Sequence, residues 1–184
     1  MRFFSIAAAL SLCALTQALV IPTGTTQGLY EVSTLDDGTE VHTKLADYSE
    51  TEVTPVSEAS PLERRQNGRM WCGCGFTLNH GDCDAAVADL KSQFRPSLIN
   101  GGKSFYSIRG SVVAFACNRS QTDWLLLPQT FTDAASAITG SCGWYIAGTT
   151  ERGDANNALI LGYMRYQNGL DFCGASTSSP ANRC

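Results

Sequence analysis

The distribution of cysteine constrains the fold of this chain more than any other feature. Seven of the eight cysteines follow Arg65: Cys72, Cys74, Cys83, Cys117, Cys142, Cys173 and Cys184. None lies between Leu19 and Arg65. A small secreted domain gains stability from disulfides because its apolar core is limited. Seven is an odd number, so we expect at most three intrachain bridges and one left-over thiol that stays free, is buried or pairs with another chain. The sequence leaves the connectivity of these bridges open.

The eighth cysteine, Cys13, lies in an N-terminal stretch with the layout of a secretory signal peptide. Arg2 provides a basic start, Phe3 to Leu15 is an almost unbroken apolar run, and Thr16-Gln-Ala18 supplies the small residues that a signal peptidase reads. A membrane anchor would need about 20 apolar residues, which is more than this run contains. We therefore expect cleavage after Ala18 and a secreted, extracellular protein without a membrane span.

Residues 19–65 differ in composition from the rest of the chain. They carry nine acidic and three basic side chains, a net charge of −6, and they contain no cysteine and no tryptophan. A segment of this composition buries too little apolar surface to offset chain entropy, so we expect it to be mostly disordered. A weak hairpin pattern runs from Tyr30 to His42 around Asp37-Gly38, and such a hairpin alone would be marginally stable.

A pair of arginines, Arg64 and Arg65, ends this acidic segment. Paired basic residues in an exposed linker are typical sites for kexin-type secretory proteases, and here the pair separates the acidic part from the cysteine-rich part. We predict a signal peptide over 1–18, a disordered acidic pro-segment over 19–65 and a mature domain over 66–184. The mature domain has nine basic and eight acidic residues and no basic stripe. Its charge therefore gives no indication of nucleic-acid binding.

Two helices are expected within the mature domain. Asp82 is a suitable N-cap for a helix over 83–94, which would end before Pro96. The apolar spacing in residues 128–139 predicts the second helix, with Gly140 as its C-terminal stop.

Four strands are expected between and after these helices, and residues 97–102 are expected to form a loop. The strands are predicted at Ser104–Ile108, Ser111–Cys117, Trp144–Thr149 and Ala158–Tyr166. The order helix, two strands, helix, two strands predicts a small disulfide-stabilised α+β sandwich, with an antiparallel sheet and two helices on one face.

Several short stretches carry a resemblance to known proteins. They are Cys72-Gly-Cys-Gly-Phe-Thr-Leu-Asn-His80, Asp82-Cys-Asp-Ala-Ala86, Phe105-Tyr-Ser-Ile108 with Ser111-Val-Val-Ala-Phe-Ala-Cys-Asn118, and Ala135 to Gly143 followed by Leu161-Gly-Tyr163. In these stretches the chain resembles small secreted fungal effector proteins that are kexin-processed and killer-toxin-like. The likeness covers most of residues 70–175 and the acidic pro-segment. It implies a killer-toxin-like α/β fold and a virulence-type role, and no functional residue is transferred from it.

Candidate catalytic residues are few in the mature domain. It contains one histidine, His80, and one glutamate, Glu151, so a nucleophile–histidine arrangement would have to use His80. Asp82 and Asp84 could form the carboxylate pair of a glycoside hydrolase, but a helix cap and a favourable first-turn acid explain them as well. We expect no catalytic set and no enzyme, with a small secreted hydrolase as the alternative.

Candidate ligand and modification sites are equally sparse. Cys72, Cys74, Cys83 and His80 could form a zinc site, but in an oxidising secretory route disulfides are favoured, so we expect no metal and no cofactor. Asn118-Arg-Ser is the Asn-x-Ser/Thr sequon of the mature part, and Asn118 is a glycosylation candidate that could also be an unmodified turn residue.

These observations favour an interaction protein. We expect a secreted cysteine-rich effector that is released by cleavage after Arg65 and acts outside the producing cell on a host. Its partner would be a host or competitor protein or a cell-surface component of open identity, and the protein would be a monomer unless the odd cysteine pairs between chains. An antimicrobial killer toxin is the first alternative, although a near-neutral mature domain does not favour it.

Overall fold

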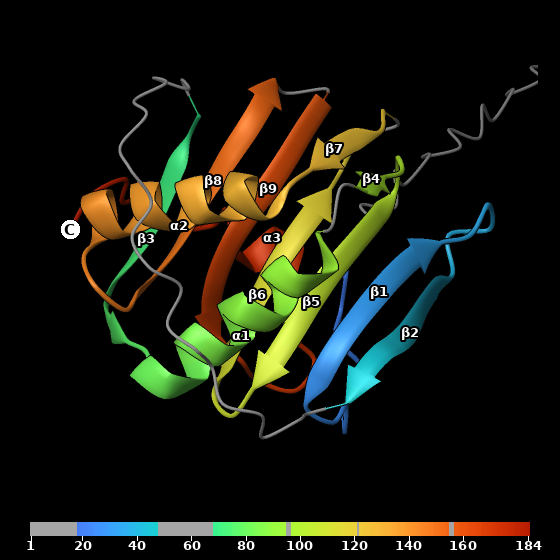
Figure 1. The fold of residues 1–184 in the computed structure, drawn as a ribbon, viewed down its shortest axis with the longest axis horizontal. Helices are drawn as coiled ribbons and strands as arrows, with labels where there is room; N and C mark the ends of the chain where they lie inside the picture. Colours follow the sequence, from blue (N-terminus) through green and yellow to red (C-terminus); the bar gives the residue numbers. More distant parts are fainter. Residues whose placement is uncertain (1–17, 48–67, 95–96, 121, 155–156) are drawn as a thin grey trace, which may run out of the picture.

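A seven-stranded antiparallel sheet forms the centre of the computed structural model, which describes residues 18–47, 68–94, 97–120, 122–154 and 157–184. In spatial order its strands are β2 (Glu40–Asp47), β1 (Gly28–Thr34), β5 (Lys103–Arg109), β6 (Val112–Asn118), β9 (Asn157–Arg165), β8 (Ile146–Asp154) and β3 (Met70–Thr77) (Figure 1). A separate two-stranded sheet pairs β4 (Ser97–Ile99) with β7 (Trp124–Leu126).

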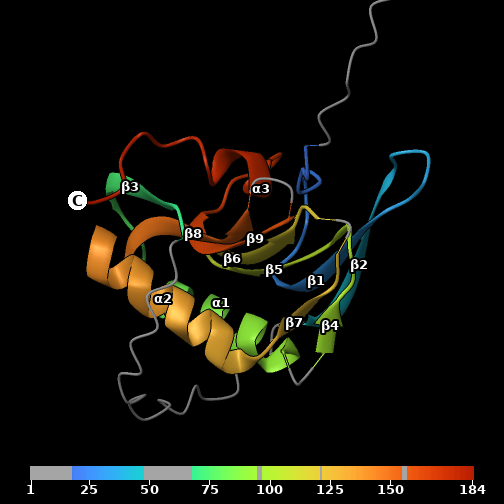
Figure 2. The ribbon, with the colours of Figure 1, turned by 90° about the horizontal axis from the view of Figure 1, so that it is seen from above.

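Two helices, α1 (His80–Gln93) and α2 (Pro128–Cys142), cover one face of the large sheet (Figure 2). Their buried side chains, including Leu90, Phe131 and Ile138, pack into one apolar core with strand residues such as Leu161. The predicted α+β sandwich, with an antiparallel sheet and two helices on one face, is therefore confirmed. Alternation along the strands places every second side chain in this core.

The opposite face of the sheet has a second apolar core. It is covered by the short helix α3 (Phe172–Ala175), which lies on the side away from α1 and α2 (Figure 2). Phe172 packs there against Tyr106 and Phe115, with ring centroids 5.2 and 5.9 Å apart. Ile21, close to the start of the described chain, is fully buried in the same cluster. Burial on both faces explains why all of β6 is buried.

The prediction that residues 19–65 are mostly disordered is wrong for residues 19–47. Strands β1 and β2 form the expected hairpin around Asp37-Gly38, where Gly38 has a φ of +84° and its N–H donates to Leu35 O at 2.8 Å. The hairpin does not stand alone, because β1 also pairs with β5 over six residue positions. Composition suggested disorder because acidic side chains dominate it, but five apolar residues of the segment are buried in the two cores: Leu19, Ile21, Leu29, Tyr30 and Val32. Residues 48–65 lie outside the described residues.

Three expected element boundaries are corrected. The N-cap of α1 is Asn79, whose side chain accepts from Asp82 N at 3.0 Å, so Asp82 lies in the first turn and is not the cap. Helix α2 continues through Gly140 to Cys142, because buried Ile138 and Cys142 keep its last turn on the sheet. The expected loop over 97–102 begins with β4.

The disulfides agree with the expected count of three bridges and one remaining thiol. They join Cys72 to Cys142, Cys74 to Cys184 and Cys117 to Cys173. Cys83 is free and buried. Over the part of the chain that the structure describes, no helix has the length and apolar character needed to cross a bilayer. The predicted signal segment up to residue 17 and the Arg64-Arg65 pair lie outside the described residues, whereas Ala18 is described and exposed.

Candidate binding pocket

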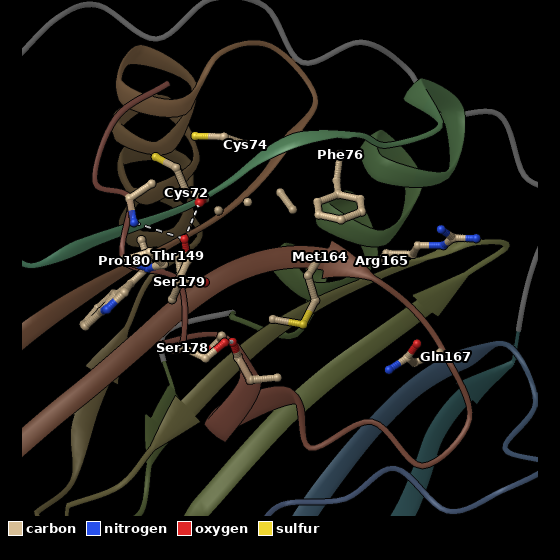
Figure 3. Close-up of a pocket in the computed structure, with 17 residues that line it drawn as sticks. Cys72, Cys74, Phe76, Thr149, Met164, Arg165, Gln167, Ser178, Ser179 and Pro180 are labelled. Carbon is tan, nitrogen blue, oxygen red and sulfur yellow. Dashed lines mark hydrogen bonds between the residues drawn. The ribbon is translucent and has the colours of Figure 1, made fainter.

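An open pocket of about 510 Å³ lies between strands β3, β8 and β9 and the chain after α3 (Figure 3). Its volume is within the range of small-ligand and side-chain pockets. Trp71, Cys72 and Phe76 contribute from β3, and Thr149 contributes from β8. The opposite wall comes from the end of β9 and from residues 175–181.

The β3 side of the pocket is built by an irregular stretch of strand. Cys72 pairs with Gly148 and Thr77 pairs with Ile146, so four residues of β3 stand opposite one residue of β8. Gly75 in this bulge has a φ of +86°, a conformation that favours glycine. The bulge leaves Phe76 61% exposed at the rim of the pocket (Figure 3).

The other wall is fixed to β3 through hydrogen bonds and a disulfide. Ser179 Oγ donates to Cys72 O at 2.6 Å, and Cys72 N donates to Ala181 O at 2.7 Å. The Cys74–Cys184 bridge holds the end of the chain against the same bulge. The pocket therefore depends on contacts between segments about a hundred residues apart.

The lining is apolar with hydroxyl groups at its edge. Phe76, Met164 and Pro180 provide apolar surface, and Thr149 and Ser178 provide hydroxyls (Figure 3). Among the described residues that line the pocket, the charged side chain is that of Arg165 on β9. Such a lining suits the binding of an apolar group with a hydrogen-bonding or anionic end, and it offers no acid–base pair.

The residues considered for hydrolysis lie elsewhere, around the start of α1. The His80 ring stacks on Tyr145 at 3.8 Å between centroids, and Tyr145 OH donates to Asp84 Oδ2 at 3.1 Å. Asp82 Oδ2 accepts from Ser111 N at 2.9 Å and from Ser111 Oγ at 3.0 Å. These contacts attach the helix to neighbouring segments, and they give His80 and Asp82 different partners.

The four candidate zinc ligands are dispersed. Cys72 and Cys74 belong to two different disulfides, and Cys83 is buried on the core-facing side of α1. Burial raises the pKa of the Cys83 thiol to about 12, with Asp84 and Asp82 acting in the same direction. A thiol that stays protonated is a weak nucleophile and a poor metal ligand.

Asn118 is not available as a glycosylation site in this fold, which corrects the prediction from its sequon. The side chain is 2% exposed. Its Nδ2 donates to Ile99 O, Asn100 O and Thr122 O at 3.2, 3.0 and 3.0 Å. A glycan is attached through this same nitrogen, so it would displace the three carbonyls. The sequon was misleading because Asn118 ends a strand whose other residues are all buried.

Sequence reasoning missed the pocket. The pattern Cys72-Gly-Cys-Gly-Phe76 contained a signal, because two glycines beside two cysteines interrupt a strand and expose an aromatic residue. Nothing local indicates that Met164 and Pro180 line the same pocket as this bulge. Met164 is placed there by the pairing of β9 with β8 and of β8 with β3, and the tail with Pro180 is held there by the Cys74–Cys184 disulfide. A comparison of the chain with protein-family models, with curated proteins and with solved structures finds no significant match.

Proposed function

We propose that this chain is a secreted, disulfide-stabilised interaction protein of the effector type. It is cleaved after Arg65 and acts on a host outside the producing cell. The observation that carries the proposal is the pocket with exposed Phe76 at its rim, which offers a recognition surface without an acid–base pair among the described residues that line it. Exposed aromatic side chains beside a pocket are frequent anchors in protein interfaces.

Two further observations support recognition over hydrolysis. Trp144 is 75% exposed and precedes β8, whose first residue, Ile146, pairs with Thr77 beside Phe76. The residues that a hydrolase would need, His80 and Asp82, are engaged in separate structural contacts. Three disulfides fit an oxidising, extracellular environment.

Leaf tissue is the test system, because an effector of this type is expected to alter the response of its host. The secreted full chain and its protease-cleaved form are applied at micromolar concentration, and the elicitor-triggered oxidative burst and cell death are recorded. The control is the same protein reduced and alkylated. A suppressed burst, or cell death, with the oxidised protein alone supports a fold-dependent effector. Equal results for both forms contradict it.

A matched pair of variants tests the pocket. Phe76→Ser removes the aromatic ring at the rim, and Leu125→Ser removes an apolar side chain of similar exposure, 56%, from β7. We expect the leaf response to be lost with Phe76→Ser and kept with Leu125→Ser, with both proteins equally resistant to urea. A response that survives Phe76→Ser removes the pocket from the proposal.

The alternative of a killer toxin is an outcome of the same experiment. If leaf tissue does not respond, growth inhibition of competing microbes is measured with the same preparations. Inhibition by the oxidised form would replace the effector proposal with a toxin. An Arg65→Ala precursor shows whether cleavage activates the protein, because equal activity of cut and uncut chains rules out an inhibitory pro-segment.

A further inference from the structure

Two paired strands of the sheet lie on opposite sides of the expected cleavage site in the sequence. Strand β1 precedes Arg65 and strand β5 follows it, yet they pair antiparallel from Gly28 opposite Ile108 to Ser33 opposite Lys103. The N-terminal segment, defined here as residues 19–47, therefore supplies two of the seven strands. In Figure 1 the blue strand β1 lies beside β5, and the cyan strand β2 lies beside β1 at the edge of the sheet.

The N-terminal segment also fills both apolar cores. Ile21 and Val32 are fully buried on the α3 side of the sheet, and Leu29 is 3% exposed on the α1 side. The Tyr30 ring stacks on Tyr106 of β5 at 4.9 Å between centroids. Removal of the segment would expose these surfaces and leave β5 as an unpaired sheet edge.

Polar contacts add to this interface. Lys103 Nζ donates to Glu31 Oε1 at 2.6 Å, and His42 Nδ1 lies 3.0 Å from Tyr106 OH. Near the start of the segment, Ile21 N donates to Leu170 O at 2.9 Å. Phe172 N donates to Leu19 O at 3.2 Å, so the segment is hydrogen-bonded to both the sheet and the chain before α3.

From these contacts we propose that cleavage after Arg65 cuts the chain without releasing the N-terminal segment, so that the active form is a noncovalent complex of two chains. The proposal rests on the processing step of the proposed function. The partner that fits the β5 edge is the chain's own residues 19–47. Retention would be entirely noncovalent, because the segment contains no cysteine.

The test uses the whole secreted precursor. It is digested with a kexin-type protease and passed through a size-exclusion column under native conditions, and the peak is analysed by mass spectrometry in denaturant. We expect both chains to elute together at the volume of the precursor and to separate in urea without a reductant. Loss of the N-terminal chain from the native peak would overturn the inference.

A second precursor separates this question from natural processing. It carries the recognition site of a sequence-specific viral protease in place of residues 60–65. Retention after this cut, together with resistance of the natural chain to the kexin-type protease, would refute the processing step and the two-chain active form, while it would confirm that the N-terminal segment stays bound without a covalent link. Cleavage of both precursors with loss of the segment from both would support the processing step and refute the retention of the segment.

Charge reversal tests the assigned interface. Glu31→Lys places two cations together, and we expect the N-terminal chain to dissociate about two- to fivefold faster from the cut protein. Adding Lys103→Glu restores the pair and the original rate. Ile21→Asp should cause the greatest loss. If Ile21→Asp prevents secretion, co-elution of the two chains decides the inference, and equal rates for Glu31→Lys and the unaltered protein would overturn the contribution of the Glu31–Lys103 pair to the interface.

Discussion

Asn118 shows how one polar side chain can organise a buried turn. Its Nδ2 shares two hydrogens among three carbonyl oxygens, while its Oδ1 accepts from Ser120 N at 3.0 Å and from Ser120 Oγ at 2.7 Å. The side chains of Asn118 and Ser120, the two residues that define the sequon, are therefore used inside the protein. Buried amides that use all their donors and acceptors stabilise one arrangement of the chain, because any substitute leaves partners unsatisfied.

Replacement of Asn118 by Asp should destabilise the fold by about 2–4 kcal/mol, because a carboxylate would face three carbonyl oxygens without a donor. Urea unfolding measures the loss. Asn182→Asp in the exposed tail serves as the control and should change the free energy of unfolding by less than about 0.5 kcal/mol. Equal stability of the Asn118 variant would show that the turn is held by other contacts.

At the scale of elements, an ion pair attaches helix α1 to strand β5. Arg109 at the end of β5 is buried, and its Nη2 donates to Asp89 Oδ1 at 2.7 Å while its Nε donates to Oδ2. Ser107 Oγ donates to the same carboxylate at 3.1 Å. The bidentate geometry fixes the position of the helix along the strand, which a purely apolar contact would do less specifically.

Asp89→Ala should destabilise the protein by about 2–3 kcal/mol, because it removes the carboxylate that accepts from a buried guanidinium. The free energy of unfolding is measured in urea and compared with that of Asp133→Ala. Asp133 lies on the exposed side of α2 and accepts from Gln129 at 2.7 Å, so its removal should have little effect. Similar losses in the two variants would refute a special role for Asp89.

At the scale of the whole molecule, a buried thiol and buried tyrosine hydroxyls make the stability of the fold depend on pH in the alkaline range. Burial raises the pKa of Cys83 to about 12 and that of Tyr163 to about 12, from ordinary values of 9.0 and 10.0. Burial also raises the pKa of Tyr106. The unfolded chain loses these protons at lower pH than the folded chain, so the contribution of these groups to stability is fully present below about pH 9 and is lost as pH rises from there toward 12.

Urea unfolding at pH 8.0 and pH 10.5 should therefore differ by about 2–3 kcal/mol, with the protein less stable at the higher pH. Cys83→Ala should show a smaller difference between the two pH values, because the group with the lowest ordinary pKa is removed. Because each protein is compared with itself at the two pH values, the stability that Cys83→Ala loses through its cavity cancels. An unchanged pH dependence in Cys83→Ala would show that the tyrosines alone account for it.

The helices, the central hairpin β5–β6 and the number of disulfides could be predicted from the sequence, because each depends on local periodicity or on a simple count. Spacing of apolar residues at helical intervals places Leu90 and Ile138 on buried faces without knowledge of their partners. An odd set of seven cysteines leaves one thiol in any pairing.

Only the tertiary structure determined the role of residues 19–47, the pocket and the state of Asn118. Each depends on segments that are distant in sequence. Strand β1 pairs with β5, the tail held by Cys74–Cys184 lines one pocket with Phe76, and Asn118 donates to the carbonyls of residues 99, 100 and 122. Local composition cannot encode such contacts, because burial depends on which surfaces the complete fold brings together. The acidic segment 19–47 is ordered for this reason, since a few buried apolar residues are sufficient when the edge of strand β5 supplies hydrogen bonds to β1.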